Sequence, residues 1–339
     1  MPTHNLSKSP VKKLYFPKFF IVDNKVNILF EIDTTKTKYV NHINIIGNTR
    51  TYDYVIRREL DISEGDPVND TKIKKINRHL NQLPIFSKIE INRIQINDEY
   101  EDLEIAVEET QTGSFNVGLS IDTLEGPSFL SGLKERNING TGRSLEFLIN
   151  TSDNNRAFTL STTEKFLLNS DINHKYSLVY KENDFAKSKS YKLNTFEVDT
   201  SFKYLFSDNL YHTFGVGYSL KDYIVTNSST VSNSIDSSSG ESISFSIVND
   251  LTYNSLNSFL KPTKGNFLSF ANYIETPSSS SNGFVKNLIT YKKYYALDKN
   301  IFSIQSKVGN VFSLNDSEIL SDNKFSLGGR WLRGFDSFG

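Results

Sequence analysis

Phe196-Glu-Val-Asp-Thr-Ser-Phe-Lys-Tyr204 places apolar or hydroxyl side chains at even positions and mostly charged ones at odd positions. Glu197, Asp199, Ser201 and Lys203 therefore share one face of the segment. Such period-two alternation predicts a β-strand with one apolar face and one wet face. Charges at every second position would be costly if both faces were dry. A wall between lipid on one side and a water-filled lumen on the other resolves this conflict.

The same alternation recurs, more weakly, from Gly113 onward, with no convincing helical period. We predict strands at residues 113–122, 127–137, 143–152, 156–166, 174–183, 191–206, 211–225, 240–253, 265–276, 283–297 and 301–314. Connections after even-numbered strands are mostly short, as at 207–210, whereas those after odd-numbered strands are longer and rich in Ser and Asn, as at 226–239. Residues 254–264 and 124–126 are exceptions. This sorting of loops favours an outer-membrane barrel over a soluble sandwich.

Composition excludes several function classes. The 339 residues carry 38 basic and 39 acidic side chains, so there is no field of one sign to recruit nucleic acid. The absence of cysteine excludes disulfides, thiol catalysis and cysteine metal sites. Aromatic residues make up 13% of the chain although mean hydropathy is −0.40, which suits thin two-sided strands. No apolar run approaches the roughly 20 residues of a spanning helix, and no signal peptide is visible.

Enzyme motifs are missing as well. The five histidines are scattered and lack metal-ligand spacing, and no Gly-x-Ser-x-Gly occurs. Gly215-Val-Gly217 lies in an alternating strand with no helix after it, so it does not form a phosphate loop. We expect no enzymatic activity, no cofactor and no metal site. A Ser/His/Asp cluster assembled in space is the enzymatic alternative.

Residues 39–110 have a different pattern. Strands are predicted at 39–46, 87–96 and 103–109, and helices at 51–60 and 69–83, in the order β-α-α-β-β. This unit predicts a small α+β domain with one modest core. A further strand at 24–33 has no helices before it and is interpreted as the end of a preceding copy. The predicted domains are therefore 1–38, 39–110 and 111–339.

Several local sequences resemble one family. Tyr39-Val-Asn-His-Ile-Asn-Ile-Ile-Gly-Asn-Thr-Arg-Thr-Tyr-Asp-Tyr-Val-Ile-Arg-Arg-Glu-Leu60 and Glu64-Gly-Asp-Pro67 are similar to the final POTRA domain of the BamA family of bacterial outer-membrane assembly proteins. Glu108-Glu-Thr-Gln-Thr-Gly-Ser-Phe-Asn-Val-Gly118 resembles its entry into the first barrel strand. Asn139-Gly-Thr-Gly142 and Pro262-Thr-Lys-Gly265 resemble its periplasmic turns. The resemblance covers residues 24–339.

The resemblance implies a fold, a location and a set of partners. The chain would be a β-rich protein in which a POTRA domain precedes an incomplete antiparallel transmembrane β-barrel, with about eleven of sixteen strands. It would lie in the bacterial outer membrane with the POTRA part in the periplasm. Its partners would be the outer-membrane lipid bilayer, assembly lipoproteins and unfolded outer-membrane protein clients. The family uses no ATP, metal or covalent intermediate. We expect that this 339-residue form does not close a barrel or insert clients alone, and that about five further strands follow residue 339.

The first barrel strand is the candidate lateral-gate edge on which client strands would pair. Its residues are Ser114, Phe115, Asn116, Val117, Gly118, Leu119, Ser120 and Ile121. Gly113 and Gly118 would weaken the seam, because glycine offers no side chain to pack. The alternative is that these glycines relieve crowding in the barrel wall.

A second candidate site is the loop after the eleventh strand, which is similar to the family motif usually written Val-Arg-Gly-Phe. Its residues are Gly328, Gly329, Leu332, Arg333, Gly334 and Phe335, and Leu332 and the preceding Arg330-Trp331 depart from the family pattern. The resemblance implies that this loop tucks into the lumen as a latch. Arg333 would pair with an acidic side chain in a strand beyond residue 339, and the planar guanidinium favours arginine over lysine there. The alternative is a solvated arginine in a mobile loop.

In the POTRA unit, Arg57-Arg58-Glu59 resembles the family's Arg-Arg-Glu. The resemblance assigns the partner-lipoprotein contact to Glu59 and, with less weight, to Arg57. The alternative is an ordinary exposed helix face. The strand at 87–96 is a candidate docking edge for client peptides.

Three functions are compatible with this sequence. The first is an assembly factor that inserts client β-barrels through a lateral seam. The second is a two-partner-type secretion pore of the same superfamily, which exports a soluble passenger. The third is a plain porin or surface antigen, which the POTRA unit and the arginine loop disfavour.

Overall fold

The computed structural model describes residues 12–14, 18–22, 25–29, 32–34, 37–122, 126–167, 170, 172–278, 282–298, 300–316, 318–320 and 322–325. The chain divides into two compact units. The first comprises Met1–Thr112 together with Asn139–Gly142, and the second comprises Gly113–Ile138 and Arg143–Gly339.

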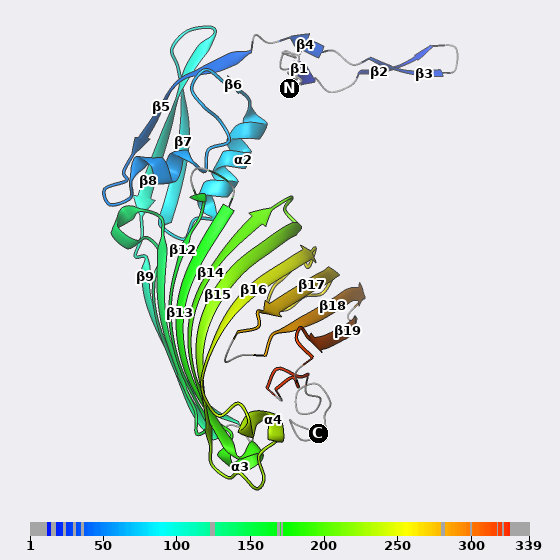
Figure 1. The fold of residues 1–339 in the computed structure, drawn as a ribbon. Coiled ribbons are helices and arrows are strands. Elements are labelled where there is room, and N and C mark those ends of the chain that lie inside the picture. Colours follow the sequence, from blue (N-terminus) through cyan, green and yellow to red (C-terminus); the bar gives the residue numbers. More distant parts are fainter. Residues whose placement is uncertain are drawn as a thin grey trace. The chain divides into compact units, whose positions relative to one another are not determined.

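The N-terminal segment forms two small antiparallel pairs (Figure 1). Strand β1 (Lys12–Leu14) pairs with β4 (Ile32–Thr34), and β2 (Lys18–Val22) pairs with β3 (Lys25–Leu29). The single strand predicted over 24–33 is therefore wrong, because β3 and β4 have different partners. Alternation shows which face each residue occupies, but it does not show where a strand stops and changes its partner. The assignment of residues 1–38 to a preceding domain stays a prediction.

The next part of the first unit is a four-stranded sheet with two helices. The sheet order is β6-β5-β8-β7, and its bounds are β5 (Lys38–Ile46), β6 (Pro67–Val68), β7 (Phe86–Gln95) and β8 (Tyr100–Glu109). Strand β5 runs parallel to β8, and β7 runs antiparallel to it. The helices are α1 (Asp53–Arg57) and α2 (Asp70–Asn81). The predicted β-α-α-β-β order is confirmed, with β6 as an added short strand and α1 shorter than expected.

A compact hydrophobic core joins the helices to this sheet. Its buried members come from all layers of the unit and are Val40, Ile43, Val55, Ile56, Ile62, Val68, Ile76, Leu80, Leu83, Ile85, Ile89, Leu103, Ile105 and Val107. Helix α2 begins after Asn69, whose side chain accepts a hydrogen bond from Lys72 N (2.8 Å), as a helix cap does. Its predicted apolar stripe faces this core, with Ile73 partly buried against it.

No helix in the described part of the chain is long and apolar enough to cross a membrane.

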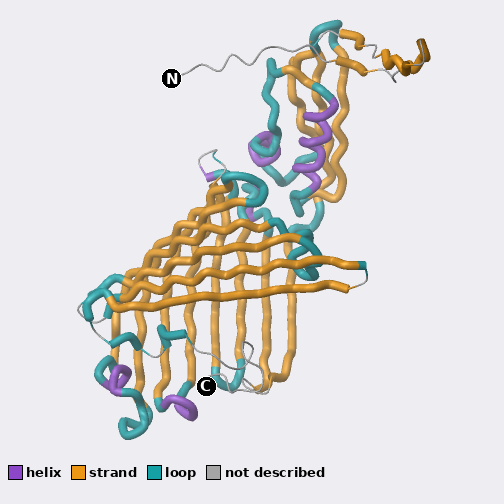
Figure 2. Tube along the Cα trace, turned by 90° about the vertical axis from the view of Figure 1, so that its right-hand side faces the viewer, coloured by secondary structure: helices purple, strands orange, loops and turns teal. Residues whose placement is uncertain are grey.

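The second unit is one antiparallel sheet of eleven strands, in which each strand pairs with the next in sequence. Its strands are β9 (Gly113–Asp122), β10 (Gly126–Glu135), β11 (Ser144–Thr151), β12 (Asn155–Glu164), β13 (Ile172–Asp184), β14 (Tyr191–Leu205), β15 (Leu210–Val225), β16 (Gly240–Asn254), β17 (Gly265–Glu275), β18 (Phe284–Leu297) and β19 (Asn300–Ser313). Figure 2 shows the sheet bent into a curved wall. All eleven predicted strands are present, and no strand end shifts by more than two residues.

The connections follow the predicted sorting only in part. Residues 123–125 and 152–154 are short connections on the rim predicted to be long, and residues 255–264 are a long connection on the rim predicted to be short. The β14–β15 turn is tight, and Phe206 N donates to Leu210 O (2.9 Å) across it. The longer connections after β13 and β15 contain short helices, α3 (Ala186–Lys189) and α4 (Asn233–Asp236), which lie at the same end of the wall (Figure 1). These helices were not predicted, because four residues are too few to show a helical period.

Strand register carries the alternation across the whole wall. Phe158 lies opposite Tyr180, Tyr180 opposite Phe196, Phe196 opposite Leu220, and Leu220 opposite Ile243. All five side chains lie on the apolar face, which we call the outward face. The opposite, inward face carries ion pairs such as that between Lys181 Nζ and Glu197 Oε2 (3.1 Å). The two-faced strand predicted from residues 196–204 is thus confirmed.

One outward row is polar. Asn249 lies opposite Asn272, Asn272 opposite Asn287, and Asn287 opposite Asn310. The amide of Asn272 donates to Asn287 Oδ1 (2.7 Å), and the amide of Asn287 donates to Asn310 Oδ1 (3.1 Å). These amides satisfy one another on a face where an unpaired polar group would be costly.

Glu109, at the end of β8, ties the loop at residues 49–51 to the sheet. Its carboxylate accepts hydrogen bonds from Thr51 N (2.6 Å), Arg50 N (3.0 Å) and Thr49 Oγ1 (2.9 Å). The side chain is only 6% exposed and also pairs with Arg50 Nε (3.2 Å). Burial alone would raise the pKa of Glu109, but the hydrogen bonds from Thr51, Thr49 and Arg50 favour the carboxylate and lower the pKa from 4.5 to about 2.

We predict that Glu109→Gln lowers the free energy of unfolding at pH 7 by about 2 kcal/mol. A lowered native pKa stabilises the fold above the ordinary carboxyl range, and this contribution is lost as the pH falls from 4.5 towards about 2. The variant should therefore show a flatter stability profile over this window. Urea titrations of a fragment spanning residues 37–112, which has its own core, measure both effects. Glu108→Gln is the matched control, because Glu108 is 66% exposed. Equal losses in the two variants would contradict the prediction.

Candidate functional site

The candidate edge strand β9 lies at one end of the eleven-stranded sheet. Among the described residues it pairs with β10 alone, in a continuous register from Gly113 opposite Glu135 to Asp122 opposite Gly126. Its other side presents backbone N–H and C=O groups that no described strand satisfies. Such a row is a template on which another strand can pair.

The side chains of β9 alternate cleanly between the two faces. The exposed fractions are 68% for Phe115, 57% for Val117, 82% for Leu119 and 88% for Ile121. Leu119 lies opposite Phe129 of the outward face, so these four residues continue the apolar band to the edge. Residues 113–121 contain no charged side chain. Edge strands that must stay unpaired usually carry lysine or proline, and β9 has neither in this stretch.

The glycines of β9 are not required for space. A Cβ added at Gly118 would meet Leu130 Cβ at 3.8 Å, and one at Gly113 would meet Glu135 Oε2 at 3.4 Å, which are ordinary contacts. In contrast, a Cβ at Gly217 of β15 would lie 2.5 Å from Asp199 Oδ1 and 2.6 Å from Ser246 Oγ. Crowding therefore accounts for Gly217 but not for Gly118. This contrast favours a role for Gly118 in weakening the seam.

In the POTRA-like unit, the two residues predicted to contact a lipoprotein have different surroundings. The guanidinium of Arg57 donates to Ile43 O (2.8 Å) and forms ion pairs with Asp53 and with Glu64 (3.8 Å). Arg57 is thus engaged inside its own domain. Glu59 follows the helix, is half-buried, and its backbone N–H donates to Ile56 O (3.0 Å).

The third predicted site lies outside the described residues. This applies to all six latch positions, namely Gly328, Gly329, Leu332, Arg333, Gly334 and Phe335. Their role stays a prediction.

The sequence alone did not reveal an ion pair on the inward face. Lys221 of β15 reaches across β16 to Glu275 of β17, with 2.8 Å between Nζ and Oε2. The two side chains are 12% and 3% exposed, and Tyr273 Oη donates to the same carboxylate (3.2 Å). Strand parity places both residues inward, but it does not show that side chains 54 positions apart meet. Among the described residues no group of three His, Asp or Glu side chains is arranged to hold a metal ion.

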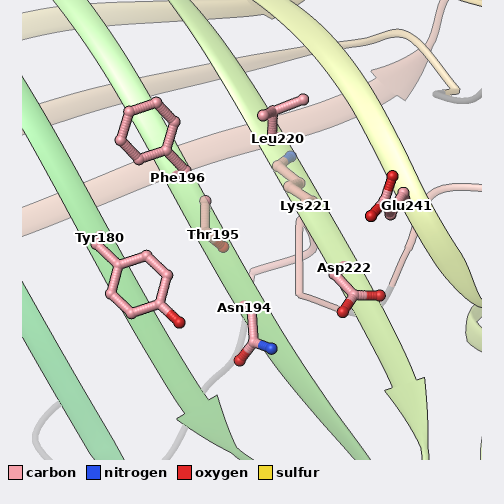
Figure 3. A pocket seen from close by; sticks show the side chains of 8 residues that line it. All are labelled: Tyr180, Asn194, Thr195, Phe196, Leu220, Lys221, Asp222 and Glu241. Carbon is pink, nitrogen blue, oxygen red and sulfur yellow. The ribbon is translucent and has the colours of Figure 1, made fainter.

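A shallow cavity of about 190 Å³ lies on β13–β16 (Figure 3). It is lined by Tyr180, Asn194, Thr195, Phe196, Leu220, Lys221, Asp222 and Glu241. Phe196 and Leu220 belong to the outward apolar band, whereas Asn194, Asp222 and Glu241 form the next outward row and lie opposite one another. The cavity therefore marks where the apolar band gives way to a polar rim.

We predict that substitutions at Arg57 and Glu59 have separable effects. Arg57→Ala removes the bond to Ile43 O and two ion pairs, so it should lower the free energy of unfolding by about 1 kcal/mol. Glu59→Gln keeps the side-chain size and should change it by less than about 0.5 kcal/mol. Glu59→Gln should instead weaken capture of assembly lipoproteins. Urea titration and co-purification measure the two properties, and normal capture by Glu59→Gln would exclude the contact.

Known proteins share this architecture. A family model described as the Omp85 superfamily domain matches residues 137–339. A POTRA model, described as a surface antigen variable number repeat, matches residues 38–110. Outer membrane protein assembly factor BamA of Neorickettsia risticii is 27% identical over 327 residues, covering 94% of this chain and 43% of the relative. BamA of Nitratidesulfovibrio vulgaris is 25% identical over 322 residues, covering 93% and 40%. The chain thus spans about two fifths of the length of these relatives.

Solved structures share the fold. BamA from Haemophilus ducreyi lacking POTRA domains 1-3 superimposes with a TM-score of 0.79 at 22% identity, covering 97% of this chain and 66% of that one. CdiB from Acinetobacter baumannii superimposes with a TM-score of 0.53 at 14% identity, covering 92% and 58%. With a POTRA domain followed by a superfamily domain over more than half of its length, the chain belongs to the Omp85 superfamily and is BamA-like.

Proposed function

We propose that this chain is part of an outer-membrane assembly factor that inserts client β-barrel proteins through the edge of β9. The observation that carries the proposal is an end strand whose residues 113–121 carry no charge, whose outward side chains are apolar, and whose one side pairs with no described strand. The relatives named as assembly factors, which match over more than nine tenths of this chain, support it.

The mechanism follows from the cost of unpaired backbone in lipid. A client strand cannot enter the hydrocarbon with free N–H and C=O groups. Pairing with β9 satisfies one side of that strand, and each later client strand can pair with the one before it. The outward set Phe115, Val117, Leu119 and Ile121 also fixes register, because a slip by one residue would turn a client's apolar side chains inward. No nucleotide or covalent step is needed.

The remaining parts have roles in this scheme. The POTRA domain would lie in the periplasm, where Glu59 contacts an assembly lipoprotein. Strand β7 has β8 as its neighbour and lies at the end of its sheet, so it offers client peptides a second edge. Arg333 would latch the loop after β19 inside the lumen through an acidic side chain beyond residue 339.

The second candidate is a pore that exports one soluble passenger. The CdiB structures favour this alternative at the level of the fold, with TM-scores of 0.53 and 0.55. The BamA structure superimposes better, with a TM-score of 0.79. The two functions differ in the number of proteins that depend on the chain.

We predict that depleting the protein containing this chain lowers the assembly of many outer-membrane proteins together. Quantitative proteomics of purified outer membranes measures this directly. Loss of a single secreted protein, with the others at normal levels, would instead support the pore.

We further predict that proline substitutions at Val117 and Gly118 have different effects. Successive residues of an antiparallel strand direct their N–H groups to opposite sides, so one proline disrupts the β9–β10 ladder and the other removes a donor at the free edge. The variant that keeps the β9–β10 ladder is recognised by its folded wall. It should insert clients about tenfold more slowly, as expected for the loss of one hydrogen bond in a dry environment.

Heat-modifiable migration reports folding, and insertion of a radiolabelled client into vesicles reports activity. The adjacent variant is the control, because it also removes one backbone N–H and introduces a proline ring, one residue away. Normal insertion by both variants would exclude β9 as the templating edge.

A further inference from the structure

The chain after β19 turns back onto the inward face of the wall. Leu314 N donates to Gly283 O (2.9 Å), and Asn282 Nδ2 donates to Glu318 O (3.4 Å). A turn then forms in which Asn323 N donates to Leu320 O (3.0 Å). We call Leu320 and residues 322–325 the foot of this loop. The foot contacts the neighbouring strand β19 and also strands as distant in sequence as β14 and β15.

The first contact of the foot is with β14 and β15. A small buried cluster lies there, formed by Tyr191, Leu193, Tyr223, Val231 and Ile235. Leu320 packs against this cluster. Tyr223 Oη donates to Asp322 Oδ2 (2.8 Å), and the Tyr223 side chain is only 2% exposed. A hydroxyl so deeply buried stabilises the fold only if it has a partner, and the foot supplies it.

The second contact is with β18 and β19. Lys286 Nζ donates to Asn323 O (3.1 Å) and lies 4.5 Å from the centre of the Phe325 ring. The ring covers Gly309 of β19, where an added Cβ would lie 2.5 Å from Phe325 Cζ. Glycine at this position therefore leaves the space that the ring occupies.

The Asp322 carboxylate has oppositely charged side chains near it. Its Oδ1 atom is buried and makes no hydrogen bond within the described part of the chain. A buried carboxylate is costly unless cations stabilise it. Lys189 of α3 and Lys286 both attract this carboxylate. The foot thus places an anion where the wall and the rim supply a hydroxyl and two cations.

We propose that the foot is a fixed attachment of the loop to the wall, with Tyr223 and Gly309 as its positioning residues. The attachment spans β15 to β19, so the loop that leads to Arg333 starts from a set position on strands of this chain. Its contribution to client insertion rests on the proposed function, whereas the attachment itself does not.

Trypsin cleavage after Lys324 tests the attachment in outer membranes that contain the natural protein. Tyr223→Phe removes the hydroxyl, and Gly309→Val displaces the Phe325 ring. Each substitution should raise the cleavage rate about tenfold, because losing one contact raises the population of the locally opened state that trypsin cleaves. Tyr218→Phe, on the other face of β15, and Ser303→Val, on the inward face of β19 away from the foot, are matched controls and should leave the rate unchanged.

Mass spectrometry of the Lys324–Phe325 bond gives the rate, and heat-modifiable migration shows that each variant is folded. Unchanged cleavage in both test variants would overturn the attachment. Faster cleavage with normal client insertion would overturn its contribution to insertion. Failure of the proposed function itself shows separately, as normal client assembly after depletion of the unmodified protein.

Discussion

The structure depends on the pairing of backbone groups where water is absent. A strand with an apolar face against lipid must give every N–H and C=O group a partner within the sheet. Strands β10 to β18 each have two neighbours and meet this requirement. Strand β9 leaves one side open in the described structure, and its side chains supply neither charge nor proline to block pairing. The same constraint that stabilises the wall thus leaves one row of backbone groups of β9 available for pairing in the described structure.

Side-chain alternation then determines where polar groups can lie. On the inward face, Lys221 and Glu275 meet across an intervening strand, and the pair is nearly buried. Removing either side chain deprives the other, nearly buried charge of this ion pair, which is costly. On the outward face, the amides of Asn272, Asn287 and Asn310 bond to one another. Both arrangements follow from register, because a shift by one residue would separate every partner.

The sequence predicts the repeating part of this fold well, because period-two alternation is a local signal that survives in residues 196–204 and its neighbours. Loop lengths are a weaker signal, because short and long connections occur on both rims. Contacts between distant segments are not local signals. The division of residues 24–33 into β3 and β4, the engagement of Arg57 by Ile43 O, and the bond from Tyr223 to Asp322 all depend on partners that no spacing reveals.

The surroundings of the glycines differ along the wall. At Gly309 and Gly217 the neighbouring atoms leave no room for a Cβ, so these glycines permit close packing among β14 to β19. The ion pair, the amide row and the foot lie in the same half, between β15 and β19. At Gly118 a Cβ would fit, and residues 113–121 can form no ion pair because they carry no charge. Residues 113–121 therefore add no ion pair to the β9–β10 ladder, whereas the following strands are also joined by pairs such as Lys134–Glu146 and Lys181–Glu197.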